Sequence, residues 1–255
     1  MTLNNEEEAK VLREDLERLY KWSEDWNMLF NVDKCVVMHV GGKNSKFEYE
    51  MGDRKLRVTE EEKDLGVIIH RSAKPSRQCI EAANKANKVL GLIRRTVISR
   101  DKNIILRLYK TLVRPHLEYC AQVWSPYMQK DKEVLEKVQR RATRMIKGFG
   151  TLTYEERLEK CGLTSLEKRR CRGDLIETYK LMTNKGAAAP SRFFQMAHRG
   201  GLRGHRFKII RKSEGSIKQR FFSSRVTNAW NELGDEIVSA KTVDSFKAKL
   251  GEMGY

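Results

Sequence analysis

Residues 135–149 read Leu-Glu-Lys-Val-Gln-Arg-Arg-Ala-Thr-Arg-Met-Ile-Lys-Gly-Phe, a pattern with the period of an amphipathic helix. At about 100° per residue, the apolar side chains fall within an arc of about 100°, which predicts a face packed on a core. The basic side chains fall on the opposite side, and residues 137–150 contain no acid. The apolar set is Leu135, Val138, Ala142, Met145, Ile146 and Phe149; the basic set is Lys137, Arg140, Arg141, Arg144 and Lys147.

The basic face of this helix has the charge and spacing to meet phosphate groups. Its five cations extend over about 15 Å of helix axis. Each strand of a nucleic-acid duplex carries one phosphate per about 3.4 Å, so several phosphates could be met at once. A helix face that is merely solvated usually mixes both signs of charge. We therefore predict that this face contacts the phosphates of a nucleic acid.

Further helices are predicted from about residue 76 to the end of the chain, where strand-like runs are absent. Pro115 should end or kink the first of them. The sequences 153–156 and 164–167 have the form of capping boxes, so a helix should begin at each, and Gly162 should end the earlier one. Thr242 is a candidate N-cap near the C-terminus. The apolar faces behind these predictions are Ile104, Ile105, Leu108 and Leu112; Leu175, Ile176, Tyr179 and Met182; Phe222, Val226, Ala229, Trp230 and Leu233; and Val243, Phe246 and Leu250.

The first 75 residues have a different pattern. Residues 6–26 predict a helix whose apolar face contains Ala9, Leu12, Leu16, Leu19, Tyr20 and Trp26. Four strand-like runs follow at 36–40, 47–51, 55–58 and 65–69, with turn residues Gly41-Gly42 and Gly52-Asp53 between runs. This part should form a small antiparallel sheet with one helix.

The predicted fold class is therefore α+β, with a small sheet first and a mostly α-helical remainder. We expect three parts, residues 1–75, 76–150 and 151–255. Residues 183–204, rich in Gly, Ala and Arg, should be a basic linker or exposed loop within the last part.

The charge of the chain points to a polyanionic partner. The sequence has 51 Lys and Arg against 34 Asp and Glu, a formal net charge of +17. Residues 1–30 carry four basic and eight acidic side chains, so the positive charge lies in the remainder. Nucleic acid is the usual partner of such a field, although a soluble basic surface without a dedicated ligand is the alternative.

Several classes of function are not supported by the sequence. No apolar run approaches the roughly 20 residues that span a bilayer, and residues 1–8 lack the apolar core of a signal peptide, so we expect an intracellular protein, cytoplasmic or nuclear. The five cysteines lack metal-ligand spacing and should be reduced thiols. No phosphate-binding glycine motif is present. The acids of residues 60–64 could hold Mg²⁺ but better fit a solvated turn, so we expect no cofactor.

Two further basic segments are weaker candidates for nucleic-acid contact. The run 168–172 contributes Arg169, Arg170 and Arg172, and it could equally be a nuclear address. The segment 192–212 contributes Arg199, Arg203 and Arg206. Aromatic side chains among its cations could stack on unpaired bases or belong to a local core; they are Phe193, Phe194, His198, His205 and Phe207.

A long collinear series of motifs resembles the reverse transcriptases of jockey-like non-LTR (LINE) retrotransposons. Residues 15–23, Trp26 and residues 30–35 resemble the segment after the catalytic strand of the palm, and residues 61–67 resemble the next palm motif. The thumb of that family is resembled by residues 112–119, 123–126 and 135–142. The similarity continues through residues 163–170 and 222–231.

The resemblance implies the end of a palm at residues 1–75, a helical thumb at 76–150 and a C-terminal helical extension at 151–255. In that family the thumb grips the primer–template duplex. An RNA–DNA hybrid or an RNA duplex is therefore the expected partner.

The fingers and the Asp-Asp turn of the family have no counterpart in this sequence. Phosphoryl transfer needs those carboxylates to hold two Mg²⁺ ions, which we expect only in a complete enzyme. The leading hypothesis is therefore an inactive, duplex-binding C-terminal remnant of an RNA-directed DNA polymerase. The alternatives are a split polymerase completed by a missing half in trans, and a non-functional or protein-interaction helical fragment. The incomplete sheet should also expose an edge and some apolar surface.

Overall fold

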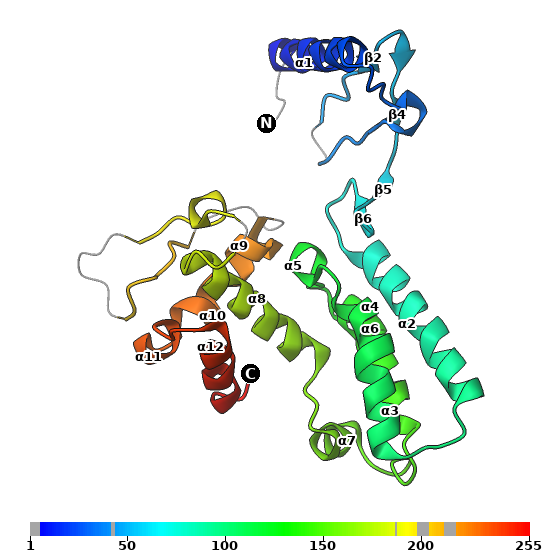
Figure 1. The fold of residues 1–255 in the computed structure, drawn as a ribbon, viewed down its shortest axis with the longest axis vertical. Helices are drawn as coiled ribbons and strands as arrows, with labels where there is room; N and C mark the ends of the chain where they lie inside the picture. Colours follow the sequence, from blue (N-terminus) through cyan, green and yellow to red (C-terminus); the bar gives the residue numbers. More distant parts are fainter. Residues whose placement is uncertain (1–5, 42–43, 187, 198–203, 212–217) are drawn as a thin grey trace. The chain divides into compact units, whose positions relative to one another are not determined.

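The computed structural model describes residues 6–41, 44–186, 188–197, 204–211 and 218–255. The chain forms two compact units, Met1–Gln78 and Cys79–Tyr255. Helices dominate, and each sheet found among the described residues has two strands, so the α+β class is confirmed in this general form (Figure 1).

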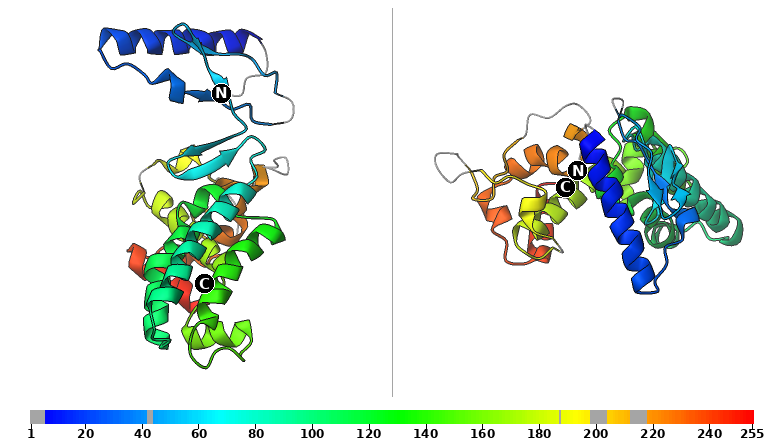
Figure 2. Two further views of the ribbon diagram at one scale, coloured as in Figure 1. Left: turned by 90° about the vertical axis from the view of Figure 1, so that its right-hand side faces the viewer. Right: turned by 90° about the horizontal axis from the view of Figure 1, so that it is seen from above.

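The first unit consists of one long helix and short strand pairs. Helix α1 (Glu6–Asp25) contacts strand β2 (Glu50–Met51), and Figure 2 shows the helix lying across these strands. The predicted single antiparallel sheet is wrong. Two pairs are antiparallel, but β1 (Val36–Val37) pairs in parallel with β4 (Arg57–Val58). A buried trio, Tyr49, Met51 and Leu56, forms the core of the unit together with side chains of α1.

Two hairpins in this unit differ in how well the sequence predicts their turns. Strand β2 pairs with β3 (Arg54–Lys55) across the predicted turn, where Gly52 has a φ of +58°. The acids of residues 60–64 were expected in a solvated turn, but residues 61–64 form strand β5 (Glu61–Asp64), paired with β6 (Val67–His70). Gly66, at φ +87°, closes this second hairpin. The acids of β5 thus belong to a strand ladder.

Helix α1 leaves part of its apolar surface exposed. Leu19 and Trp26 were expected on its packed face, but they are 43% and 68% exposed, whereas the polar Ser23 is buried. Ser23 is accommodated because its hydroxyl donates to the carbonyl of Tyr20. Trp22 is also 46% exposed. The prediction that Leu19 and Trp26 lie on a packed face of the helix is therefore wrong.

Apart from one bridge between Met196 and Ile209, the regular secondary structure among the described residues of the second unit is helical. Figure 1 shows α2, α3 and α6 beside one another, with α8 leading to the last helices. The bounds are α2 (Ser76–Thr96), α3 (Lys102–Leu108), α4 (Arg114–Glu118), α5 (Ala121–Trp124), α6 (Gln129–Arg144), α7 (Tyr154–Cys161), α8 (Leu166–Met182), α9 (Phe222–Arg225), α10 (Thr227–Asn231), α11 (Asp235–Val238) and α12 (Val243–Glu252).

Pro115 is accommodated by a π-helical turn. Between α3 and α4 the backbone forms a π-helix, Tyr109–Val113, and Pro115 then lies in the first turn of α4. The first turn is where a missing N–H costs least, because those groups lack helical acceptors anyway. The helical path is therefore neither ended at Pro115 nor broken before it.

The predicted helix ends are largely found. Thr153 forms a complete capping box with Glu156 at the start of α7, and Gly162, at φ +57°, ends that helix. Thr242 caps α12 by accepting from the N–H of Ser245. At α8 the helix begins as expected, but Ser165 rather than Thr164 is the cap, accepting from the N–H of Lys168.

The last third of the chain has its own core. Its largest buried members come from α8 and α10–α12 and include Tyr179, Trp230 and Phe246. Tyr179 stacks on Phe246 at 4.2 Å between ring centroids. The segment expected to be a linker and the residues after it take part, because Phe194 and Ile209 are 4% exposed within this core. The single helix expected at 222–233 is instead the two short helices α9 and α10.

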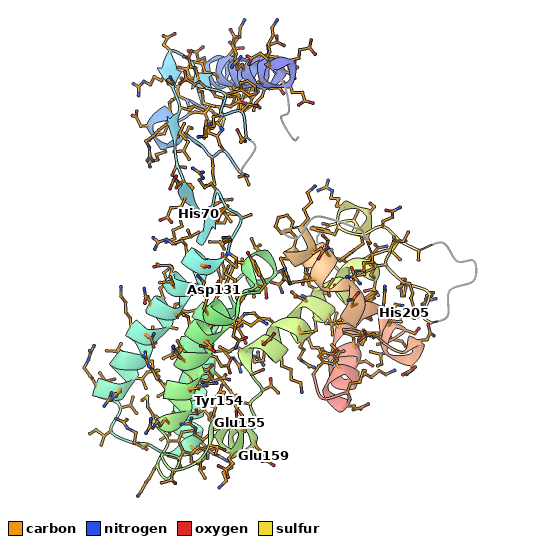
Figure 3. The ribbon with its side chains drawn as sticks, turned by 180° about the vertical axis from the view of Figure 1, so that it is seen from behind. His70, Asp131, Tyr154, Glu155, Glu159 and His205 are labelled. Atoms are coloured by element: carbon orange, nitrogen blue, oxygen red, sulfur yellow. The ribbon has the colours of Figure 1, made fainter. Side chains whose placement is uncertain are left out.

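His205, labelled in Figure 3, is buried against Trp230 of this core. The Phe207 N–H donates to Nδ1 at 3.2 Å, which leaves Nε2 to donate to the Trp230 carbonyl at 3.0 Å. Burial lowers the pKa of His205, and the neighbouring Lys208 lowers it further.

The unfolding free energy should therefore fall as the pH is lowered. The unfolded chain takes up a proton near the ordinary histidine pKa of about 6.5, whereas the folded chain takes it up only at lower pH. We expect urea denaturation to show lower stability at pH 5.5 than at pH 7.5, and a smaller difference in His205→Gln. An exposed-site control, His116→Gln, should keep the wild-type difference; equal pH dependence in both variants would contradict this role.

Candidate nucleic-acid interface

The predicted basic face of α6 is at the surface. Lys137, Arg140, Arg141 and Arg144 are exposed, whereas Leu135, Val138 and Ala142 on the opposite side are buried. Helix α6 ends at Arg144, although the helical pattern of the sequence continues to Phe149. Lys147 is exposed in the turn that follows, where its N–H donates to the Arg100 carbonyl at 2.9 Å.

A buried glutamine holds α6 in place on its packed side. Gln139 is fully buried, and its Oε1 accepts from the Tyr109 hydroxyl at 2.7 Å. Its Nε2 donates to the Tyr154 hydroxyl at 2.9 Å and to the Thr164 carbonyl at 3.0 Å. Glu136 joins this network by accepting from the Tyr154 hydroxyl and from the Leu166 N–H. These bonds tie α6 to three other segments and so determine which face of α6 points outward.

Replacing Gln139 by alanine should destabilise the second unit. The change leaves several buried hydrogen-bonding groups without a partner, which typically costs about 1–3 kcal/mol for each group. We expect a loss of about 2–4 kcal/mol in the free energy of unfolding, measured by urea denaturation. Gln129→Ala, on the exposed start of the same helix, is the matched control and should change stability by less than about 0.5 kcal/mol. Equal effects of the two changes would contradict the role given to Gln139.

A groove between α2 and α6 gathers four arginines. Its volume is about 530 Å³, and its lining includes Arg94 and Arg100 as well as Arg141 and Arg144. The other described residues of the lining are Asn87, Leu90, Gly91 and Met145, so none of the described lining residues is acidic. Guanidinium groups on both sides, with no carboxylate in the part of the lining that the structure describes, make this groove a favourable place for a polyanion.

Local contacts hold the two sides of the groove in register. Arg141 donates to Oδ1 of Asn87 at 3.1 Å, which links α6 to α2. Arg100 donates to the carbonyls of Arg94 and Val97 and so caps the end of α2. There is open space at Gly91, since a Cβ atom there would meet no atom within 4 Å.

Sequence reasoning missed Arg94 and Arg100. The one available signal was the spacing of Asn87, Gly91 and Arg94, which places them on one face of a helix. That spacing does not show that the face lies beside the arginines of α6, because the two helices are separated by more than thirty residues of chain.

The second basic run is used to hold the fold together. Arg170 is 6% exposed and donates to the Leu117 carbonyl with its guanidinium over the Trp124 ring, so the predicted contact of this side chain with phosphate is wrong for this fold. Arg169 makes a two-bond ion pair with Glu118. Arg172 donates to the carbonyls of Lys247 and Tyr255 and so joins α8 to α12. None of the three belongs to the candidate interface on α6.

The third basic segment is described only in part. Arg199 and Arg203, together with His198, lie outside the described residues. Arg206 is exposed, and its guanidinium lies 4.8 Å from the centroid of the Phe207 ring. Of the interleaved aromatic side chains, Phe194 and His205 are buried and Phe207 packs on the core, whereas Phe193 is 40% exposed. Three of these aromatic side chains, Phe194, His205 and Phe207, therefore belong to a local core and are not free to stack on bases.

Metal ligands, reactive thiols or membrane-spanning helices among the described residues would indicate other functions. No group of three His, Cys, Asp or Glu side chains comes together there as metal ligands would. The five cysteines are free; Cys79 is buried, and burial raises the pKa of its thiol to about 12. None of the described helices has both the length and the apolar character required to cross a bilayer.

Comparison with family models, with curated proteins and with solved structures found no match for this chain. The candidate interface is therefore supported by the geometry and charge of α6 and the groove.

Proposed function

We propose that the second unit binds a nucleic-acid duplex through phosphates, using the exposed basic face of α6 and the arginines of the adjoining groove. The observation that carries the proposal is the convergence of Arg94, Arg141 and Arg144 on one groove, beside the α2-capping Arg100, with no acid among the described lining residues. Lys137 and Lys147 extend the same positive surface along and beyond α6.

The geometry favours a backbone-directed mode of binding. Arginine forms charge-assisted hydrogen bonds with phosphate oxygens, and such contacts are independent of base sequence. The cations of α6 are spaced by about one helical turn, so each could meet a different phosphate. The preferred duplex in this proposal is an RNA–DNA hybrid or RNA, in keeping with the resemblance of residues 112–142 to the thumb of jockey-like reverse transcriptases.

On this proposal the chain contributes duplex binding to a reverse transcriptase, and it does not catalyse polymerisation by itself. The palm, thumb and extension assignments of residues 1–75, 76–150 and 151–255 belong to the same proposal. The lack of catalysis in this proposal is supported by the absence of an Asp-Asp turn from the sequence, because two-metal phosphoryl transfer needs such carboxylates.

A single substitution in the groove tests the proposal without removing any arginine. Gly91→Glu places a carboxylate where a Cβ has open space, and replacing a helical glycine should not destabilise α2. We expect the affinity for a labelled RNA–DNA hybrid to fall about tenfold, as for the loss of one phosphate contact. Fluorescence anisotropy with the hybrid, a DNA duplex and single-stranded RNA would also rank the three ligands.

Gly251→Glu is the matched control for this experiment. Gly251 is also helical with open space at its Cβ position, and the change in net charge is the same. An equal loss of affinity in the two variants, or no preference for duplex over single strand in the wild type, would contradict the proposed interface.

A second candidate function rests on the first unit. The exposed Leu19, Trp22 and Trp26 of α1 and its end give the unit an apolar surface of the kind that packs against another protein. A polymerase half supplied in trans would fit there. This candidate requires primer extension when the two proteins are mixed, and it is contradicted if mixing yields none.

A further inference from the structure

A second cavity lies in the C-terminal part of the second unit. Its volume is about 380 Å³, and its lining comes from the segment before α6, from α8, and from residues around 193–195, 209–211 and 219–229. Pockets for small ligands usually have volumes of about 300–1,000 Å³, so the cavity is large enough for one compact ligand.

The charge of the lining favours an anion. Two ion pairs are internal to it: Lys132 lies 2.5 Å from Glu167, and Arg225 lies 2.8 Å from Asp174. With these acids neutralised, Arg211 and Arg220 remain as exposed cations of the lining, and neither pairs with an acid among the described residues.

Aromatic rings line the same cavity as these cations. The Arg220 guanidinium lies 5.2 Å from the centroid of the Tyr127 ring, and both residues line the cavity. Phe193, also in the lining, is 40% exposed, and its ring lies against that of Phe194 at 6.3 Å between ring centroids. Aromatic rings and arginine planes are the surfaces on which unpaired bases stack.

We propose that this cavity binds one unpaired nucleotide. The phosphate is held by Arg211 and Arg220, and the base stacks on Phe193. The ligand is a nucleoside monophosphate unit, either free or within a single strand. This site is distinct from the groove between α2 and α6 and does not depend on the duplex proposal.

Binding of a labelled six-nucleotide RNA, followed by anisotropy at one salt concentration, tests this site. The double variant Arg211→Glu, Arg220→Glu should lose at least about tenfold in affinity relative to a control with the same change in charge, Lys180→Glu, Lys241→Glu. Phe193→Ala, which leaves the charge unchanged and removes an exposed ring, should lose about fivefold or more. Adenosine monophosphate as competitor separates the two sources: displacement indicates the free nucleotide, and its failure indicates a strand.

Duplex measurements on the same proteins keep the two proposals apart. The cavity variants should bind duplex as their control does, and Gly91→Glu should bind the six-nucleotide RNA as the wild type does. The nucleotide site is overturned if the RNA does not bind, if the cavity variants match their control, or if Phe193→Ala has no effect.

Discussion

Reversing three charges on α6 should reduce duplex affinity about a thousandfold. The triple variant is Arg140→Glu, Arg141→Glu, Arg144→Glu. All three side chains are exposed, but Arg140 lies over the Tyr154 ring and Arg141 donates to Asn87, so urea denaturation should first establish that the triple variant is folded. Each lost phosphate contact costs roughly a factor of ten near physiological salt, and repulsion from the new carboxylates adds to the loss. Anisotropy with an RNA–DNA hybrid measures the effect.

General electrostatics must be separated from a local interface. A control triple, Lys180→Glu, Lys241→Glu, Lys247→Glu, makes the same change in net charge on α8, α12 and the segment before α12. We expect this control to lose no more than about tenfold, because distant surface charges are screened over about 10 Å at 0.1 M salt. A loss equal to that of the α6 variant would mean that net charge alone drives binding.

Removing Arg225 should destabilise the second unit even more than removing Gln139. The Arg225 guanidinium makes two bonds to Asp174, at 2.8 and 2.9 Å, and donates to the Gln122 carbonyl at 2.9 Å. Asp174 is 6% exposed, so Arg225→Met would leave a buried carboxylate without its cation. We expect a loss of about 3–5 kcal/mol in the free energy of unfolding, measured by urea denaturation.

The pH dependence and a double variant identify the cause. Burial already raises the pKa of Asp174, although Arg225 lowers it in part. Without Arg225 the pKa should rise further, so the destabilisation of Arg225→Met should be greatest at high pH and should shrink as Asp174 protonates on acidification. Replacing both partners, Asp174→Leu with Arg225→Met, should recover most of the stability. A pH-independent loss that the double variant does not repair would point to lost packing instead.

Features encoded in local sequence were predicted well. The capping box at Thr153, the stop at Gly162 and the exposed cations of α6 each depend on residues within one or two helical turns. Local chemistry was ambiguous where two neighbouring residues could serve, as at α8, where Ser165 is the cap in place of Thr164.

Features that depend on distant segments were not predictable. Arg170 has the sequence context of a surface cation, but the Leu117 carbonyl, 53 residues away, receives its hydrogen bond. Gln139 has neighbours typical of a polar surface, yet its partner Tyr109 is 30 residues earlier in the chain. Arg94 belongs to the interface only because α6 lies beside α2. Tertiary contacts between separate helices decide all three.

The most direct test of the proposed interface is the salt dependence of duplex binding, measured in parallel for the wild type and the α6 triple variant. Each phosphate contact contributes about −0.9 to the slope of log affinity against log salt on a DNA duplex. The proposed interface predicts a wild-type slope of about −3 to −5 and a slope about 2.7 shallower for the triple variant. Equal slopes for the two proteins would contradict it.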